Sequence, residues 1–118
     1  MKMKHGLVVV VAMLLPALAQ AGAPSAFVIC GACHAVRRGA SGGIGPTLAG
    51  VYGRESGSLP GYQYSPALKA KHVKWTETTL DTWLKSPNSY APGTKMAYAG
   101  QPDAGARKAL IAYLKTLK

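Results

Sequence analysis

The chain has 118 residues, with 14 lysines and arginines against 4 aspartates and glutamates, which gives a formal net charge of +10. This length favours a single domain. The charge suits an acidic protein partner, a nucleic acid or an acidic membrane surface, but the sequence contains no nucleic-acid-binding motif, so we expect no nucleic acid partner.

The N-terminal segment has the pattern of a secretory signal peptide. Lys2 and Lys4 precede an apolar run, residues 7–19, and an Ala-Gln-Ala cleavage pattern ends at Ala21. The run is short for a transmembrane helix, which needs about 20 apolar residues, and an uncleaved anchor is the alternative. Removing 21 of the 118 residues leaves a domain of 97, residues 22–118, and losing two lysines lowers the formal charge from +10 to +8. We expect export to the periplasm.

The first segment of the domain carries Cys30-Gly31-Ala32-Cys33-His34, in a short helix that we expect over residues 24–33. On a helical turn the two cysteines and the histidine are spaced i, i+3 and i+4, so two thiols and an imidazole share one face. This arrangement suits a haem held by thioether bonds from Cys30 and Cys33, with His34 on the iron.

Three other interpretations of this motif remain open. A thioredoxin-like redox pair needs a preceding strand and a βαβ unit, neither of which the sequence indicates. A structural zinc site needs four ligands, so His34 and His72 would have to join the two cysteines. A disulfide between Cys30 and Cys33 suits an exported protein but leaves His34 without a role.

A second candidate iron ligand comes from the methionines. Three of the four lie in the leader, at positions 1, 3 and 13, so the processed chain keeps only Met96. It follows a Pro-Gly turn in residues 90–96, and irregular backbone of this kind can wrap a flat cofactor. A lone methionine more often fills a gap in the core. Beside the Cys-Cys-His motif, we predict that Met96 is the second axial ligand.

The remaining sequence predicts helices joined by loops. Two segments rich in glycine, serine and proline, residues 37–45 and 52–64, are predicted to be loops. After the second loop, Ser65 and Pro66 have the residue types of a helix cap and a first helical position. They predict a helix of about two turns.

Two longer helices are predicted in the last third of the chain. Thr76 caps the first, which we expect to run to Lys85 and to end before Pro87. Asp103 opens the second, and its apolar stripe, expected to face the core, comprises Leu110, Tyr113, Leu114 and Leu117. No segment alternates with the period of a strand, so the predicted fold class is all-α.

The Cys-Cys-His motif, the run of residues 45–54, Trp75, the segment 92–96 and Ala99-Gly100 occur in one order along the chain. With them the sequence resembles class I cytochrome c, the mitochondrial-type and related bacterial branch, without a gap from Cys30 to Lys115. The resemblance implies a small cytochrome c fold of short helices and loops, wrapped around one covalently bound haem c.

The resemblance also implies how the haem is surrounded. A backbone carbonyl beside Pro46 would accept a hydrogen bond from His34 Nδ1, and three side chains would shield the two propionates and hydrogen-bond to them: Arg54, Tyr64 and Trp75. Trp83 is a departure, because many relatives carry a tyrosine there. The predicted haem-binding residues are Cys30, Cys33, His34, Pro46, Arg54, Tyr64, Trp75, Trp83, Thr94 and Met96, with His34 and Met96 as metal ligands and no catalytic residue.

The predicted function is a periplasmic single-electron carrier with no enzymatic activity. It would shuttle electrons between a dehydrogenase or membrane quinol-oxidising complex and a terminal oxidase or reductase. We expect a monomer that meets redox protein partners and reaches a membrane surface only through them. The alternatives are a dedicated haem c subunit of a redox enzyme complex, and a haem peroxidase or gas-binding protein in which Met96 is displaced.

The resemblance also predicts an unusual docking face. Mitochondrial relatives ring the exposed haem edge with lysines, but at the matching places this chain keeps only Lys95. We expect a mostly apolar rim of Ile29, Ala91 and Ala97 to be desolvated against a partner. The other basic residues, Arg107 among them, are expected to lie largely away from this edge.

Overall fold

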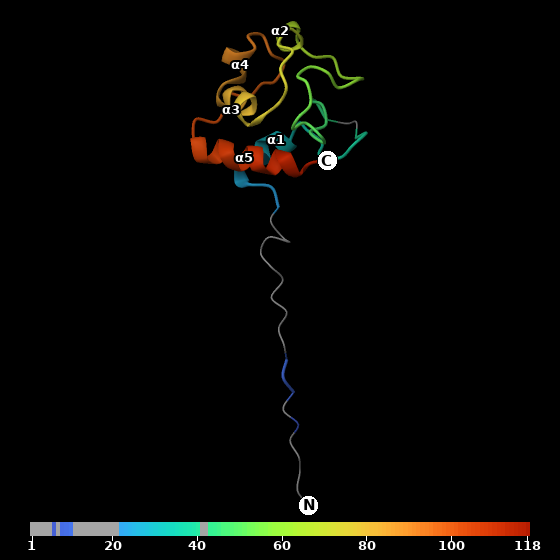
Figure 1. Cartoon of the computed structure of the whole chain (residues 1–118), viewed down its shortest axis with the longest axis vertical. Coiled ribbons are helices and arrows are strands. Elements are labelled where there is room, and N and C mark those ends of the chain that lie inside the picture. The colour runs from blue at the N-terminus through green and yellow to red at the C-terminus, as the bar shows by residue number, and fades with distance from the viewer. Residues whose placement is uncertain (1–5, 7, 11–21, 41–42) are drawn as a thin grey trace, which may run out of the picture.

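Helices and loops make up the structure, a computed structural model that describes residues 6, 8–10, 22–40 and 43–118 (Figure 1). Most of the predicted signal peptide, residues 1–21, lies outside these ranges. Within them no strand is present apart from one isolated bridge between Glu55 and Lys74, which confirms the all-α class. No helix in the described ranges is both long and apolar enough to cross a membrane.

The segment with the cysteines is a tight first turn followed by a short helix, η2 (Ser25–Phe27) and α1 (Val28–Gly31). The prediction of one helix over residues 24–33 is wrong in this detail, because no side chain caps either start and Gly31 favours an early end. The turn still closes through the motif, since the backbone N–H groups of Cys33 and His34 donate to Cys30 O at 3.0 and 2.9 Å.

Three helices form the middle of the chain. In α2 (Pro66–Lys69) Ser65 is the N-cap and its hydroxyl accepts from Leu68 N–H at 3.3 Å, as predicted. A capping box on Thr76 opens α3 (Glu77–Lys85), also as predicted. The helix α4 (Pro87–Tyr90) was not predicted, because Pro87 was interpreted only as the end of α3. Ser86-Pro87 repeats the cap-and-proline pattern of Ser65-Pro66, which is the signal that identifies it.

The last helix, α5 (Ala104–Thr116), lies across one side of the domain and packs on α3 and η2 (Figure 1). Asp103 caps it as predicted, with Oδ2 accepting from Ala106 N–H at 2.7 Å. Its buried side includes Leu110, Ile111 and Leu114. The buried face of α5 differs slightly from the predicted stripe. Tyr113 is only half-buried and lies edge-on to Phe27, whereas Ile111, which the stripe did not include, is more deeply buried.

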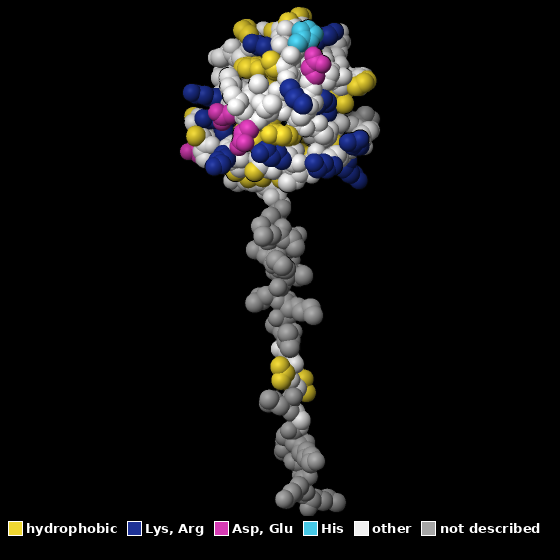
Figure 2. Space-filling model, in the orientation of Figure 1, with side chains coloured by type: hydrophobic (Ala, Val, Ile, Leu, Met, Phe, Trp, Pro, Cys, Tyr) yellow, Lys and Arg dark blue, Asp and Glu magenta, His cyan; other side chains and the backbone are white. Residues whose placement is uncertain are grey.

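Basic side chains are spread over the visible face of the domain and outnumber acidic ones there (Figure 2). Arg107 is an exception to this surface distribution. Its side chain is only 8% exposed, so its charge lies inside the fold.

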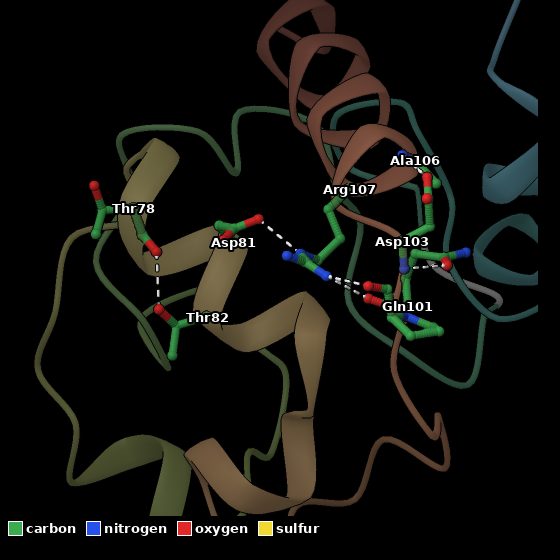
Figure 3. Close-up of polar contacts among 8 residues, drawn as sticks. Thr78, Asp81, Thr82, Gln101, Asp103, Ala106 and Arg107 are labelled. Atoms are coloured by element: carbon green, nitrogen blue, oxygen red, sulfur yellow. Dashed lines mark hydrogen bonds and ion pairs between the residues drawn. The ribbon is translucent and has the colours of Figure 1, made fainter.

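Arg107 joins α5 to two other parts of the fold (Figure 3). Its Nε donates to Asp81 Oδ1 on α3 at 2.8 Å, and its Nη1 donates to the backbone carbonyls of Gln101 and Pro102 at 2.9 and 3.0 Å. A buried guanidinium is costly unless acceptors satisfy it, and these three do so. The contact therefore fixes the segment that follows Met96 against α3.

We expect Arg107→Met to destabilise the fold by about 2 kcal/mol, because two backbone carbonyls lose a charged donor. Asp81→Asn should cost less than about 1 kcal/mol, since the amide oxygen still accepts from Nε and the side chain lies near solvent. Denaturant unfolding of both variants measures the difference. Equal costs would mean that the ion pair, and not the two carbonyl contacts, carries the stabilisation.

Candidate haem site

The three residues of the motif open onto one cavity of about 280 Å³ inside the fold. Cys30, Cys33 and His34 all line it, so the turn brings two thiols and an imidazole together as the spacing predicts. The other walls are largely apolar and come from η2, α2, α3 and α5, with Phe27, Leu68, Leu80, Trp83 and Leu110 among the lining side chains. A cavity of this kind suits a large apolar ligand with a few fixed polar groups.

His34 is held in one orientation. Its Nδ1 donates to the backbone carbonyl of Pro46 at 2.7 Å, so the expected carbonyl acceptor is that of Pro46 itself. Because Nδ1 carries the proton, Nε2 keeps its lone pair for a metal. The ring leaves no room for a side chain at Gly45, where a Cβ atom would lie 2.5 Å from His34 Cε1. The loop that leads into Pro46 therefore packs directly against the imidazole.

Met96 reaches the same cavity from a different part of the chain, the loop between α4 and α5. Two contacts within that loop shape it: Thr94 N–H donates to Ala91 O at 3.0 Å, and Met96 N–H donates to Thr94 Oγ1 at 3.4 Å. Further along, Gln101 N–H donates to Leu84 O at 2.8 Å. Together with Arg107, these bonds hold the loop across the cavity.

A tight passage beside α3 also fixes this loop. Gly100 has φ +105°, a backbone conformation that a side chain rarely adopts. A Cβ atom at Gly100 would also collide with the carbonyl oxygen of Lys85. Glycine is therefore required where the loop turns toward α5.

Both cysteines are free thiols in the structure, so no disulfide joins them. Burial raises the pKa of the Cys30 thiol, which disfavours the thiolate that a thioredoxin-like redox pair needs. The zinc interpretation loses its fourth ligand, because His72 lies at the surface with Nδ1 3.2 Å from Glu55 Oε1. Over the described part of the chain, no cluster of three or more His, Cys, Asp or Glu side chains could hold a metal ion.

The polar side chains predicted to face the propionates lie in the cavity wall. Arg54 is oriented by two backbone carbonyls, with Nη1 donating to Ala49 O at 3.2 Å and Nη2 to Thr47 O at 3.4 Å. The Tyr64 hydroxyl accepts from Leu59 N–H at 3.3 Å, and burial raises the pKa of Tyr64, so its proton remains available for donation.

An aromatic cluster forms one side of the cavity. The ring centroids of Trp75 and Trp83 are 5.6 Å apart, and Tyr90 lies 6.2 and 6.1 Å from them. Trp83 is buried. The indole therefore contributes mainly apolar packing, as large aromatic side chains do.

Several residues of this site were not predicted. Tyr62, Tyr98 and Ile44 line the cavity but were not named as candidates. Ile44 carried the clearest signal, a β-branched residue alone in a Gly/Ser-rich loop, two positions before Pro46. The prediction that Ala91 belongs to an exposed rim is wrong, because that residue is fully buried.

Comparison with known proteins relates this site to a family. No protein-family model matches the chain. It is 45% identical over 98 residues to cytochrome c2 iso-2 of Magnetospirillum molischianum, a match covering 83% of this chain and 100% of that protein. The chain is a class I cytochrome c. It is also 40% identical over 116 residues to cytochrome c2 of Blastochloris viridis, covering 97% of this chain and 91% of that protein.

A solved structure agrees with this assignment. Cytochrome cH from Methylobacterium extorquens superposes with a TM-score of 0.71 at 42% identity, over 77% of this chain and 91% of that chain. The predicted cytochrome c fold is thereby confirmed. Membership in this family makes the chain an electron carrier rather than an enzyme.

The residues of the site fit the one covalent haem c that this family carries. Cys30 and Cys33 place two thiols on one turn at the cavity wall, and His34 has its Nε2 lone pair free beside them. The apolar walls exclude water from a flat ring. The predicted cofactor is confirmed, with Cys30 and Cys33 as its points of attachment.

We expect Gly45→Ala to disturb the imidazole, because the new methyl group would overlap the ring of His34. Overpacking should cost about 1–3 kcal/mol, and a weaker bond to Pro46 O should raise the reduction potential. Gly53→Ala is the matched control: its φ is +86° with no atom within 4 Å, so strain alone should cost about 1 kcal/mol at unchanged potential. Voltammetry and unfolding of both variants test this, and an equal potential in the two would contradict it.

Proposed function

We propose that this chain is a periplasmic carrier of single electrons in which His34 and Met96 are the axial ligands of the haem iron. The observation that carries the proposal is the bond from His34 Nδ1 to Pro46 O, which leaves Nε2 free in a cavity that Met96 also lines. Imidazole and thioether together are a known ligand pair of low-spin cytochrome haem.

The other predicted haem-binding residues have roles that their positions support. The Pro46 carbonyl fixes the tautomer of His34, and Thr94 Oγ1 anchors the backbone at Met96. Arg54 and Tyr64 line the cavity and carry N–H and O–H groups that would donate to the propionates. Trp75 and Trp83 would pack against the porphyrin ring of the haem.

Haem iron with two protein ligands gains or loses one electron and leaves no open position for a substrate. The surrounding chain sets how readily that happens. Leu68 and Trp83 keep the cavity apolar, which disfavours the more positively charged oxidised state. A thioether from Met96 acts in the same direction.

The cellular setting of the proposal is export followed by soluble exchange with protein partners. The signal-peptide pattern of residues 1–21 supports export, and residues 22–118 would then form the working domain. A dehydrogenase or membrane quinol-oxidising complex is the proposed donor, and a terminal oxidase or reductase the acceptor. We propose a monomer, which suits successive encounters with two partners.

We expect Met96→Ala to abolish the Met–iron charge-transfer band and lower the potential, while the haem stays attached through Cys30 and Cys33. Lys95→Ala is the control, because it removes the bond from Nζ to Gln63 O but keeps the sulfur. Visible spectra and voltammetry measure both effects. A band that survives in Met96→Ala would disprove the ligand assignment.

The same proteins separate the carrier from a gas-binding protein or peroxidase. We expect ferrous native protein to be inert to carbon monoxide and the Met96→Ala variant to bind it, since only the variant has an open position. Prompt, tight binding by the native protein at neutral pH would favour the alternative function.

A further inference from the structure

Three large apolar side chains are exposed beside the motif: Val28 at 77%, Ile29 at 58% and Ile44 at 80%. Ile29 and Ile44 also line the haem cavity, so they mark its opening. Among the large apolar side chains exposed in residues 22–40 and 43–118, only Tyr52 lies elsewhere. Such clustering is typical of an interaction site. We name Val28, Ile29 and Ile44 the apolar rim.

The fold fixes the apolar rim in place. In η2 the side chain of Phe27 packs into the core, and the next two side chains, Val28 and Ile29, point outward. Ile44 is positioned by its neighbours: Gly45 N–H donates to Cys33 O at 2.9 Å, and a side chain at Gly43 would collide with the same carbonyl. The rim is therefore part of the rigid surroundings of the haem attachment site.

Charge is scarce at this opening. Among the described residues that line the cavity, Arg54 and Lys95 are the only charged ones. Arg54 bonds to two carbonyls of its own loop, and Lys95 Nζ donates to Gln63 O at 2.9 Å. No carboxylate lines the cavity in the described part of the chain.

Three of the basic residues have contacts elsewhere in the fold. Lys115 Nζ lies 5.1 Å from the Tyr52 ring centroid and 3.4 Å from Glu77 Oε2, and Lys71 Nζ lies 4.4 Å over the ring of Tyr90. Arg107 is buried. Basic side chains are scattered over the visible face of the domain (Figure 2).

We propose that the apolar rim docks the electron-transfer partner, and that the matching surface of that partner is apolar and uncharged. The inference rests on the proposed carrier function, because a carrier must bring the open edge of its haem site against its partner. An acidic partner surface would lose hydration against the apolar rim, while Arg54 and Lys95 are the two cationic residues that line the cavity in the described part of the chain. An apolar surface instead gains by removing three exposed side chains from water.

Voltammetry on gold coated with alkanethiols of one chain length provides defined surfaces for the holoprotein. We expect electroactive binding to methyl-terminated layers that changes little with added salt, and weak binding to carboxylate-terminated layers. A preference for carboxylate with steep loss on adding salt would overturn the inference, because it would show that basic residues form the docking face.

Variants of the rim make the test specific. Ile29→Ser and Ile44→Ser should each weaken binding to the methyl layer by about tenfold. Tyr52→Ser is the matched control, an exposed apolar residue away from the cavity, and should bind as the native protein does. The double variant Ile29→Lys/Ile44→Lys should reverse the preference toward carboxylate. Native-like binding by both serine variants would refute the assignment.

Two measurements test other occupants of the rim. Gel filtration of the native protein should give a monomer; a dimer that Ile44→Ser dissociates would show that a second copy covers the rim, against our inference. Vesicles of phosphatidylcholine should not bind the protein. Sedimentation with vesicles that Ile44→Ser abolishes would indicate a lipid surface and also overturn it.

A small soluble redox mediator distinguishes failure of this inference from failure of the proposed function. Reversible oxidation and reduction with the mediator, combined with no preference for methyl layers, would refute only the docking surface. Absence of reversible exchange with the mediator would refute the electron carrier itself. Each variant is compared with native protein by spectrum and potential, so that a disturbed haem is recognised.

Discussion

The hydrogen bond from His34 Nδ1 to Pro46 O is the contact on which the rest of the site depends. It sets the tautomer of the imidazole, and so decides which nitrogen faces the cavity. It also holds residues 43–46 against the motif. There Gly45 N–H donates to Cys33 O, and the ring of His34 leaves no space for a side chain at Gly45. One bond thus couples the imidazole of His34, the turn that carries both cysteines and the exposed Ile44.

The wall of the cavity that carries Met96 is held by different interactions. The loop that carries Met96 has no regular secondary structure, so its position comes from contacts to its neighbours. Arg107 satisfies two carbonyls at the end of this loop while pairing with Asp81, and Gly100 passes against α3 where no side chain fits. A buried charge and a close backbone approach therefore replace helical order in holding the loop.

Much of this architecture could be predicted from sequence, because the deciding signals are local. Capping residues placed the starts of α2, α3 and α5, and the i, i+3, i+4 spacing placed both thiols and His34 on one cavity. The errors were in features set by tertiary contacts. Nothing local shows that Arg107 is buried, that Ala91 is inside, or that Ile111 lies deeper than Tyr113.

The aromatic side of the cavity has a consequence for observing the protein. The chain has two tryptophans, and both line the cavity, with ring centroids 5.6 Å apart. Emission from either indole is therefore quenched by energy transfer to a haem in that cavity. When the fold opens, the indoles move away from the porphyrin and fluorescence appears. Light emitted by this protein thus reports the integrity of its haem pocket without any attached dye.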